Sequence, residues 1–272
     1  MEEAGEIQRF EYSGRIAPRA GLVGLFGLAL AALFGLLYQQ LLDVNPLILL
    51  SPFLTLLLGF LLGGLSLGTL RTAHVRNLAL ARVLVWLLPL TALLMAHLES
   101  LGFGREGFAG IGAAIQERLR QGDPLPDGSF GLAGSALVMF WIAEAICVLA
   151  IAVPLPLIWW HRAVFDEKAP GFLVRKRVAV RYGPSALSLR RAVDEGGMEA
   201  LLSLGMRKLP ENSEEGEFRF YLHEPAEDAH AWLTVQWFGK LEGPRGRKIQ
   251  RDVMVLRRIR VDRDYLQALL GD

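Results

Sequence analysis

The sequence predicts an α-helical membrane protein, with a four-span antiparallel bundle and a C-terminal soluble α+β domain. Two observations lead to this fold class. The 272-residue chain is 52% hydrophobic, with a mean hydropathy of +0.33, which is too apolar for an ordinary soluble domain. Its charges are also unevenly placed, because no lysine and only nine of the 29 Lys and Arg residues precede position 160. The chain therefore divides into a membrane block and a soluble block.

Three regions follow from this division. We expect a cytosolic N-terminal tail over residues 1–20, a transmembrane domain over 21–160 and a cytosolic α+β domain over 162–272. No small-residue cleavage site follows the first apolar run, so this run is expected to stay as an anchor. The single cysteine, Cys147, lies inside an apolar stretch. It can form no intramolecular disulfide, and a zinc cluster is excluded.

Four apolar runs each have roughly the 20 residues that a helix needs to cross the ~30 Å hydrocarbon core. A helix is required because lipid offers no partner for backbone polar groups. The expected spans cover residues 21–42, 47–70, 78–98 and 133–156. Only four residues, 43–46, join the first two spans, which predicts an antiparallel hairpin.

Residues 99–131 form the one long loop, which we expect to be external. Within it Phe108, Ile111, Ile115 and Leu119 recur at helical spacing, and charged residues occupy the other faces. This pattern is typical of a short amphipathic helix lying on a membrane surface.

Basic residues set the expected orientation. They lie in the N-terminal tail, in the 71–77 link and in the segment after Trp160, whereas the 43–46 link has none. The positive-inside rule then predicts a multi-pass protein of the plasma (inner) membrane with both termini cytoplasmic. Trp159 and Trp160 suit the inner aromatic belt, and Tyr38 suits the outer one.

The soluble block shows the alternation of half-buried strands. Strands are predicted at residues 178–182, 218–222, 233–237 and 249–261. A helix is expected over 198–209, and a final short helix, capped by Asp262, over 263–270. Residues 187–190 fit either a return strand or a helix. At about 110 residues this block is large enough to bury a core of its own.

One carboxylate, Glu144, stands out in the last apolar run, about ten residues or roughly 15 Å into the bilayer. A carboxylate at this depth normally faces the interior of a helix bundle. Thr55 and Thr91 should lie at a similar depth and could hydrogen-bond it. Glu144 is therefore a proton, ion or substrate contact, or a structural hydrogen bond between helices, or part of a subunit interface.

Small residues recur at four-residue spacing in the first two spans, which allows close approach of helix backbones. These two helices are expected to pack tightly, with each other or with another subunit. The rows comprise Gly27, Ala31 and Gly35 in the first span and Gly59, Gly63, Gly64 and Gly68 in the second.

Two polar clusters lie in the soluble block. The first is a weak metal candidate in the turn between two predicted strands, made of His223, Glu227, Asp228 and His230. The alternative is that these residues form a solvent-exposed turn without a ligand. The second is a basic surface on the C-terminal hairpin, made of Lys240, Arg245, Arg247, Lys248, Arg251, Arg257, Arg258 and Arg260. It could contact anionic lipid headgroups or an acidic partner, whereas the lack of aromatic stacking residues at its tip disfavours nucleic acid.

Two segments match the residue pattern of a catalytic or nucleotide-binding motif but lack its structural context. Residues 64–68 fit G-x-S-x-G, but they lie inside an apolar span without the required strand and turn. Residues 102–107 fit G-x-G-x-x-G, but no strand precedes them, so we expect a flexible loop. No other cofactor or catalytic signature is present in the sequence, and no cofactor is predicted.

The leading hypothesis is a non-enzymatic integral membrane protein with a cytosolic partner-binding or regulatory domain, serving as a membrane subunit of a larger assembly. Besides the lipid bilayer, it would bind a protein partner or self-associate through spans 1 and 2. The alternative is a small oligomeric transporter or channel with Glu144 lining the path. A membrane-embedded enzyme is disfavoured, because spans 1 to 3 supply few polar residues at one depth.

Overall fold

The structure is a computed structural model, which describes residues 10–44, 50–122, 131–166, 171–183, 185–197, 201, 206–208, 216–225, 230–242 and 248–270. The chain forms two compact units. The helical unit comprises Ser13–Arg162, and the sheet unit combines Met1–Tyr12 with Ala163–Asp272. Each unit is described by itself.

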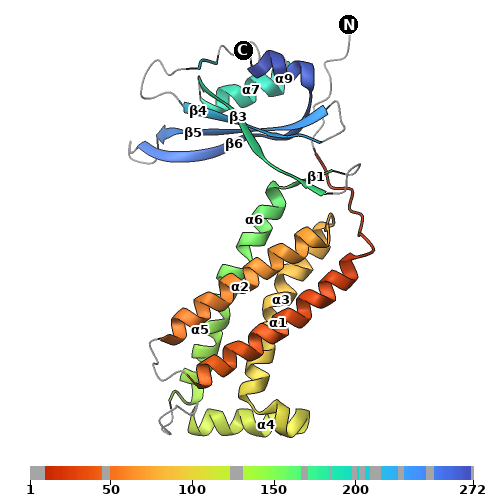
Figure 1. The fold of residues 1–272 in the computed structure, drawn as a ribbon. Helices are drawn as coiled ribbons and strands as arrows, with labels where there is room; N and C mark the ends of the chain where they lie inside the picture. Colours follow the sequence, from red (N-terminus) through yellow and green to blue (C-terminus); the bar gives the residue numbers. More distant parts are fainter. Residues whose placement is uncertain are drawn as a thin grey trace. The chain divides into compact units, whose positions relative to one another are not determined.

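Among its described residues, the helical unit contains four helices long and apolar enough to cross a membrane. Successive long helices run in opposite directions, and α4 lies across one end of the bundle (Figure 1). The helices are α1 (Ala20–Asp43), α2 (Ser51–Thr72), α3 (Leu78–Ser100), α4 (Phe103–Gln121), α5 (Gly134–Ala152) and α6 (Pro154–Arg162). The fourth candidate span covers α5 and α6 together, as Gly134–Arg162.

Local chemistry explains two of the helix boundaries. At the start of α3 the Asn77 side chain accepts a hydrogen bond from the Leu80 amide at 3.0 Å, which satisfies one of the free donors of the first turn. The helix is interrupted at Val153, between α5 and α6, because Pro154 has no amide hydrogen and cannot donate the next helical hydrogen bond. The far end of α6 is held by Trp160, whose indole donates to the Val75 carbonyl at 3.0 Å.

Within the bundle, α1 packs chiefly against α3, and α2 packs chiefly against α5. The core that joins them includes Ala31, Leu62, Leu88 and Val148, each fully buried. Large apolar side chains such as Phe26, Phe53 and Phe60 point outward and are more than 60% exposed. An apolar exterior of this kind suits contact with lipid.

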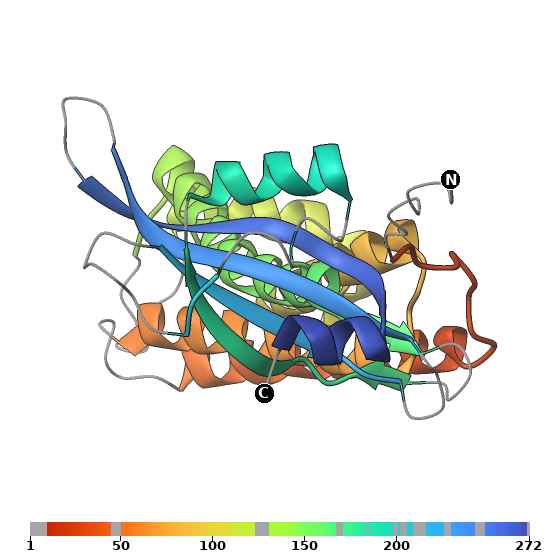
Figure 2. The same cartoon turned by 90° about the horizontal axis from the view of Figure 1, so that it is seen from above.

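The sheet unit begins with a two-stranded antiparallel sheet and continues as a four-stranded antiparallel sheet of order β3-β4-β5-β6. Helices α7 and α9 both pack against β6 and cover one face of the larger sheet (Figures 1 and 2). The elements are β1 (Val164–Asp166), β2 (Gly171–Leu173), β3 (Lys176–Gly183), α7 (Ala186–Gly196), β4 (Gly216–His223), β5 (His230–Glu242), β6 (Lys248–Asp262) and α9 (Arg263–Leu270).

The core of this unit lies between the sheet and the two helices. Alternate residues of the central strands, such as Phe218 and Phe220 of β4 and Leu233 of β5, meet Leu189 of α7 and Leu266 of α9. This alternation is the reason that the strands could be located from the sequence. Residues 187–190, left open between strand and helix, belong to α7. Most of the expected 198–209 helix lies outside the described residues.

Candidate functional site

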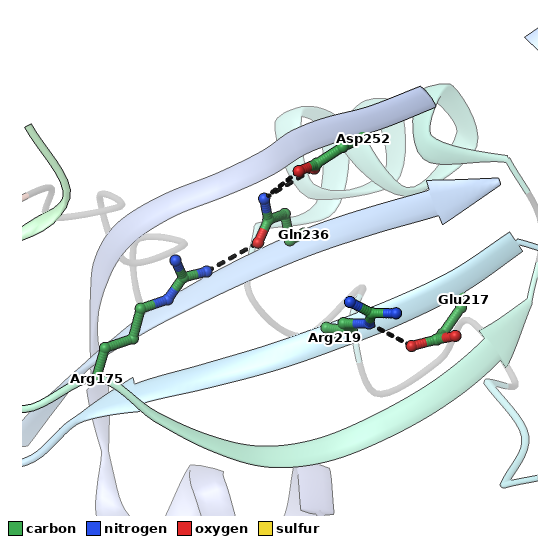
Figure 3. A network of polar contacts seen from close by, with 5 residues as sticks. All are labelled: Arg175, Glu217, Arg219, Gln236 and Asp252. Atoms are coloured by element: carbon green, nitrogen blue, oxygen red, sulfur yellow. Dashed lines mark hydrogen bonds and ion pairs between the residues drawn. The ribbon is translucent and has the colours of Figure 1, made fainter. Parts of the chain in front are cut away.

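The face of the large sheet that α7 and α9 leave uncovered carries a network of polar side chains (Figure 3). Arg175, just before β3, donates to the Gln236 side-chain oxygen at 2.9 Å. The Gln236 amide nitrogen in turn donates to both carboxylate oxygens of Asp252, at 2.8 and 2.7 Å. Gln236 is only 6% exposed. This chain of contacts fixes the position of a guanidinium group on the sheet.

Two arginines of this face lie over aromatic rings. The Arg175 guanidinium carbon is 3.5 Å from the Tyr221 ring centroid, and that of Arg219 is 3.8 Å from the Phe238 centroid. Arg219 is also paired with Glu217 through its Nε. That hydrogen bond is the main reason that the pKa of Arg219 is raised. We call these residues, together with Gln236 and Asp252, the arginine–aromatic face.

This arrangement suits binding better than covalent chemistry. A guanidinium held over a ring keeps its N–H edge available for a carboxylate or phosphate. Its partners, Glu217 and Asp252, fix its orientation and offset part of its charge. The described polar groups of the face are chiefly guanidinium, amide, carboxylate and phenol groups, which recognise ligands by hydrogen bonding.

This face is not among the sites predicted from the sequence, although the sequence contains a signal for it. In β4 the residues Glu217, Arg219 and Tyr221 alternate with the core residues, and the strand register places them opposite Phe238, Gln236 and Thr234 of β5. Alternation alone assigns them to an outward face. The contacts among outward residues depend on how strands distant in sequence pair with one another. Local sequence patterns do not specify that pairing.

Inside the helical unit, Glu144 of α5 meets a side chain that the sequence analysis had placed elsewhere. The Tyr38 hydroxyl of α1 donates to Glu144 Oε1 and lies 2.8 Å from the Thr55 hydroxyl of α2. Thr55 Oγ1 is within hydrogen-bond distance of the Ser51 carbonyl, at 3.1 Å. Three helices thus contribute to one polar cluster, which we call the intramembrane triad (Tyr38, Thr55 and Glu144).

The triad differs from the expected cluster in two respects. Tyr38, assigned to an aromatic belt, is 5% exposed and turned into the bundle. Thr91 instead bonds its own helix, at the Leu87 carbonyl 2.8 Å away. Trp160, expected in the inner belt, is likewise buried, at 4% exposure. Aromatic residues at the ends of spans can serve as belt or as packing residues, and composition does not separate the two.

The small-residue row of the first span packs against neighbouring helices of the same chain. A Cβ atom at Gly35 would lie 2.1 Å from the Ala92 carbonyl oxygen of α3, and one at Gly27 would lie 2.8 Å from Thr69 Oγ1 of α2. Ala31, between them, is fully buried. The first-span row therefore serves mainly the contact between α1 and α3.

The second-span row divides into two faces. A Cβ at Gly59 would lie 3.0 Å from Ile151 Cβ of α5, and one at Gly63 would lie 3.5 Å from the Ala152 Cα. Gly64 and Gly68 are exposed, and a Cβ at either would meet nothing within 4 Å. Among the described residues, only the face with Gly59 and Gly63 packs against another helix.

The two histidines of the weak metal candidate have separate surroundings. His223 ends β4, is 1% exposed and is hydrogen-bonded to the Leu173 backbone. Burial, and then the charges of Arg175 and Arg258, lower the pKa of His223 to about 4. His230 instead pairs with Asp262. Among the described residues no three potential ligands gather around one metal position. Glu227 and Asp228 lie outside those residues.

The described part of the basic surface is not uniform. Arg257 and Arg260 are exposed, whereas Arg258 is half-buried and donates through Nη1 to the Ala163 carbonyl at 2.9 Å. The side chains of Lys240, Arg245, Arg247, Lys248 and Arg251 lie outside the described residues.

The two segments that match these sequence motifs, residues 64–68 and 102–107, lie within a helix or at its start. Ser66 is fully buried within α2, and residues 103–107 belong to α4 and not to a flexible loop. Gly102 precedes α4 with a φ of 75°, a left-handed conformation that glycine adopts without a steric penalty. The G-x-G-x-x-G segment thus begins an amphipathic helix, and no strand precedes it among the described residues.

Comparison with protein-family models, with curated proteins and with solved structures gave no match.

Proposed function

We propose that this chain is a non-enzymatic integral membrane protein of the plasma (inner) membrane, whose C-terminal domain binds a protein partner in the cytosol as part of a larger assembly. The observation that carries the proposal is the arginine–aromatic face. Arg175 lies over a ring of β4 and Arg219 over a ring of β5, and a polar partner holds each guanidinium in place. Such groups suit acidic side chains of a partner, since a guanidinium can bind a carboxylate through two parallel hydrogen bonds.

Both termini are cytoplasmic in this proposal. Residues 10–12 belong to the same unit as the segment after Arg162, which supports a common side for the two ends. Four spans between them give the same result by parity. Self-association through span 2 is a secondary part of the proposal, and the exposed Gly64 and Gly68 support it.

Site-specific photo-cross-linking in native membranes tests the proposal. Met254 aligns with Gln236 across the sheet and marks the arginine–aromatic face, whereas Leu187 is 69% exposed on α7 and marks the covered side. We expect a photoreactive residue at 254, but not at 187, to capture a protein. Arg175→Gln combined with Arg219→Gln should abolish that product.

Arg190→Gln with Arg191→Gln, two exposed arginines of α7, is the matched control for lost charge. If both double variants reduce capture equally, or if position 187 captures the same protein as position 254, the face is not the binding surface.

The second candidate function is proton or solute transport, and the intramembrane triad favours it. The Tyr38 hydroxyl can donate to an ionised Glu144, or accept from a protonated Glu144 while donating to Thr55. The cluster therefore accommodates either protonation state by reversing its hydrogen bonds. A transport path requires this property, and a purely structural bond does not need it.

Flux in liposomes tests the second candidate. We expect Glu144→Gln to abolish proton-coupled flux and Thr91→Ala, which lies outside the triad, to leave it unchanged. Equal flux from the wild-type protein and the Glu144→Gln variant would exclude Glu144 from any transport mechanism.

A further inference from the structure

Arg258 stands at an irregularity of β6. Between the pairs Val235–Leu256 and Leu233–Ile259 the register shifts, so that Arg257 and Arg258 together lie opposite Thr234. Arg258 has a φ of 50°, which is uncommon for a residue with a side chain. Its amide lies 3.3 Å from the Thr234 hydroxyl oxygen. The bulge turns the Arg258 side chain away from the position that simple alternation would give it.

The N-terminal residues Phe10–Tyr12, which we call the strap, dock at this bulge. The Phe10 amide donates to the Arg258 carbonyl at 2.8 Å. The Phe10 ring lies edge-to-face against Trp232 of β5, with centroids 5.1 Å apart, and against Tyr12, at 5.0 Å. The Arg258 guanidinium carbon lies 5.3 Å from the Phe10 centroid and 5.7 Å from the Tyr12 centroid.

The backbone carbonyl of Ala163 joins the strap to the chain that leaves α6. It accepts from the Tyr12 hydroxyl at 2.7 Å and from Arg258 Nη1 at 2.9 Å. Burial raises the pKa of Tyr12 to about 12, although Arg258 acts against the rise. The phenol thus keeps its proton and its donor role at neutral pH. Three segments meet at one carbonyl: the strap, β6 and the residue that follows Arg162.

We propose that the strap is a short peptide bound in cis, and that the bulge of β6 is a docking site for an extended aromatic-x-aromatic segment with Arg258 as its clasp. The site offers Trp232 of β5 as a ring-packing surface, and in the edge strand β6 it offers the backbone carbonyl and the guanidinium of Arg258. Only residues 13–19 separate the strap from α1. The sheet unit is therefore joined to the spans by two segments, covalently at Ala163 and reversibly through the strap. This site is separate from the arginine–aromatic face and does not depend on a partner there.

Hydrogen exchange on the full chain in phosphatidylcholine nanodiscs tests docking. We expect Arg258→Gln to speed exchange of the Phe10 amide at least tenfold, and Arg257→Gln, an equal charge loss at the neighbouring exposed position, to leave it unchanged. Core amides of β4 and β5 report whether the sheet unit is still folded. If Arg258→Gln unfolds it, Phe10→Ala and Tyr12→Phe release the strap without touching β6. Wild-type exchange as fast as in these strap variants would overturn the proposal.

Binding in trans tests the site itself. The probe is a fluorescent synthetic peptide of residues 8–15, and the receptor is the chain lacking residues 1–12, in the same nanodiscs. We expect saturable binding to this receptor and at least tenfold weaker binding to the wild-type chain, whose site is occupied. A peptide with alanine at the Phe10 and Tyr12 positions should not bind. Absence of binding to the truncated chain, with its core amides still protected, would refute a docking site for this sequence.

Discussion

Substitution of Gly35 by alanine is the sharpest test of the packing in the helical unit. The added Cβ would lie 2.1 Å from the Ala92 carbonyl oxygen and 2.8 Å from its carbon, where ordinary contact begins at 3.4 Å. Both are backbone atoms, so no side-chain rotation relieves the clash, and α1 or α3 must move. Overpacking of this kind costs about 1–3 kcal/mol, and a backbone clash belongs at the upper end. Better helix propensity returns up to about 1 kcal/mol.

We therefore expect Gly35→Ala to lower the free energy of unfolding by about 2 kcal/mol. Gly21→Ala is the matched control, because it makes the same change in α1 itself, at a position where nothing lies within 4 Å. It should be neutral or stabilising by up to about 1 kcal/mol. Reversible unfolding of the purified chain in bicelles, measured by steric trapping, gives both values. If the two variants are equally stable, the contact between α1 and α3 is not as close as described.

Three further predictions concern other contacts. Because the folded-state pKa of His223 lies near 4 and its ordinary value is 6.5, the unfolded chain binds more protons between these values. The free energy of unfolding should then fall as the pH drops from 6.5 to 4, by at most about 3 kcal/mol at about 1.4 kcal/mol per pKa unit. Denaturant titration of the wild-type protein and of His223→Phe at several pH values measures this loss. Identical pH profiles for the two proteins would contradict a lowered pKa of His223. Tyr38→Phe removes a hydroxyl that bonds two helices and should cost about 0.5–2 kcal/mol in the bicelle assay, whereas Thr91→Ala should cost less than Tyr38→Phe, and equal losses would refute the bridging role. Gly216→Ala should destabilise the sheet unit by about 1–3 kcal/mol or more, because the added Cβ would lie 1.7 Å from the buried indole nitrogen of Trp237. Its strand partner Gly183 should tolerate alanine, because the nearest atom to a Cβ there is 3.4 Å away. Thermal unfolding that ranks the two variants in the reverse order would contradict the structure.

The four apolar helices were predictable because a span is set by one quantity, the length of an uninterrupted apolar run. The expected third span, residues 78–98, corresponds to α3 at Leu78–Ser100. The fourth continues past its expected end because α6 resumes the helix after Val153. Strand positions were predictable for a similar reason, because apolar buried residues and polar outward residues alternate along most of β4.

The sites were harder to predict because they depend on which faces meet. Glu144 was singled out by its depth, but its partner Tyr38 lies 106 residues away on a helix whose rotation no local pattern specifies. Arg258 was grouped with the basic surface of the C-terminal hairpin because it lies among other Lys and Arg residues in the sequence. The bulge shifts the register by one residue and turns this side chain toward the strap. Long-range pairing decided both cases.

Docking of the strap also imposes an order on biogenesis. Tyr12 leaves the ribosome 151 residues before its acceptor, Ala163, and Arg258 comes later still. At about 5–20 residues per second, roughly 10–50 s of synthesis separate the strap from its clasp. All four apolar helices are made in that interval. The strap must therefore remain undocked until β6 has been synthesised and the sheet unit can close.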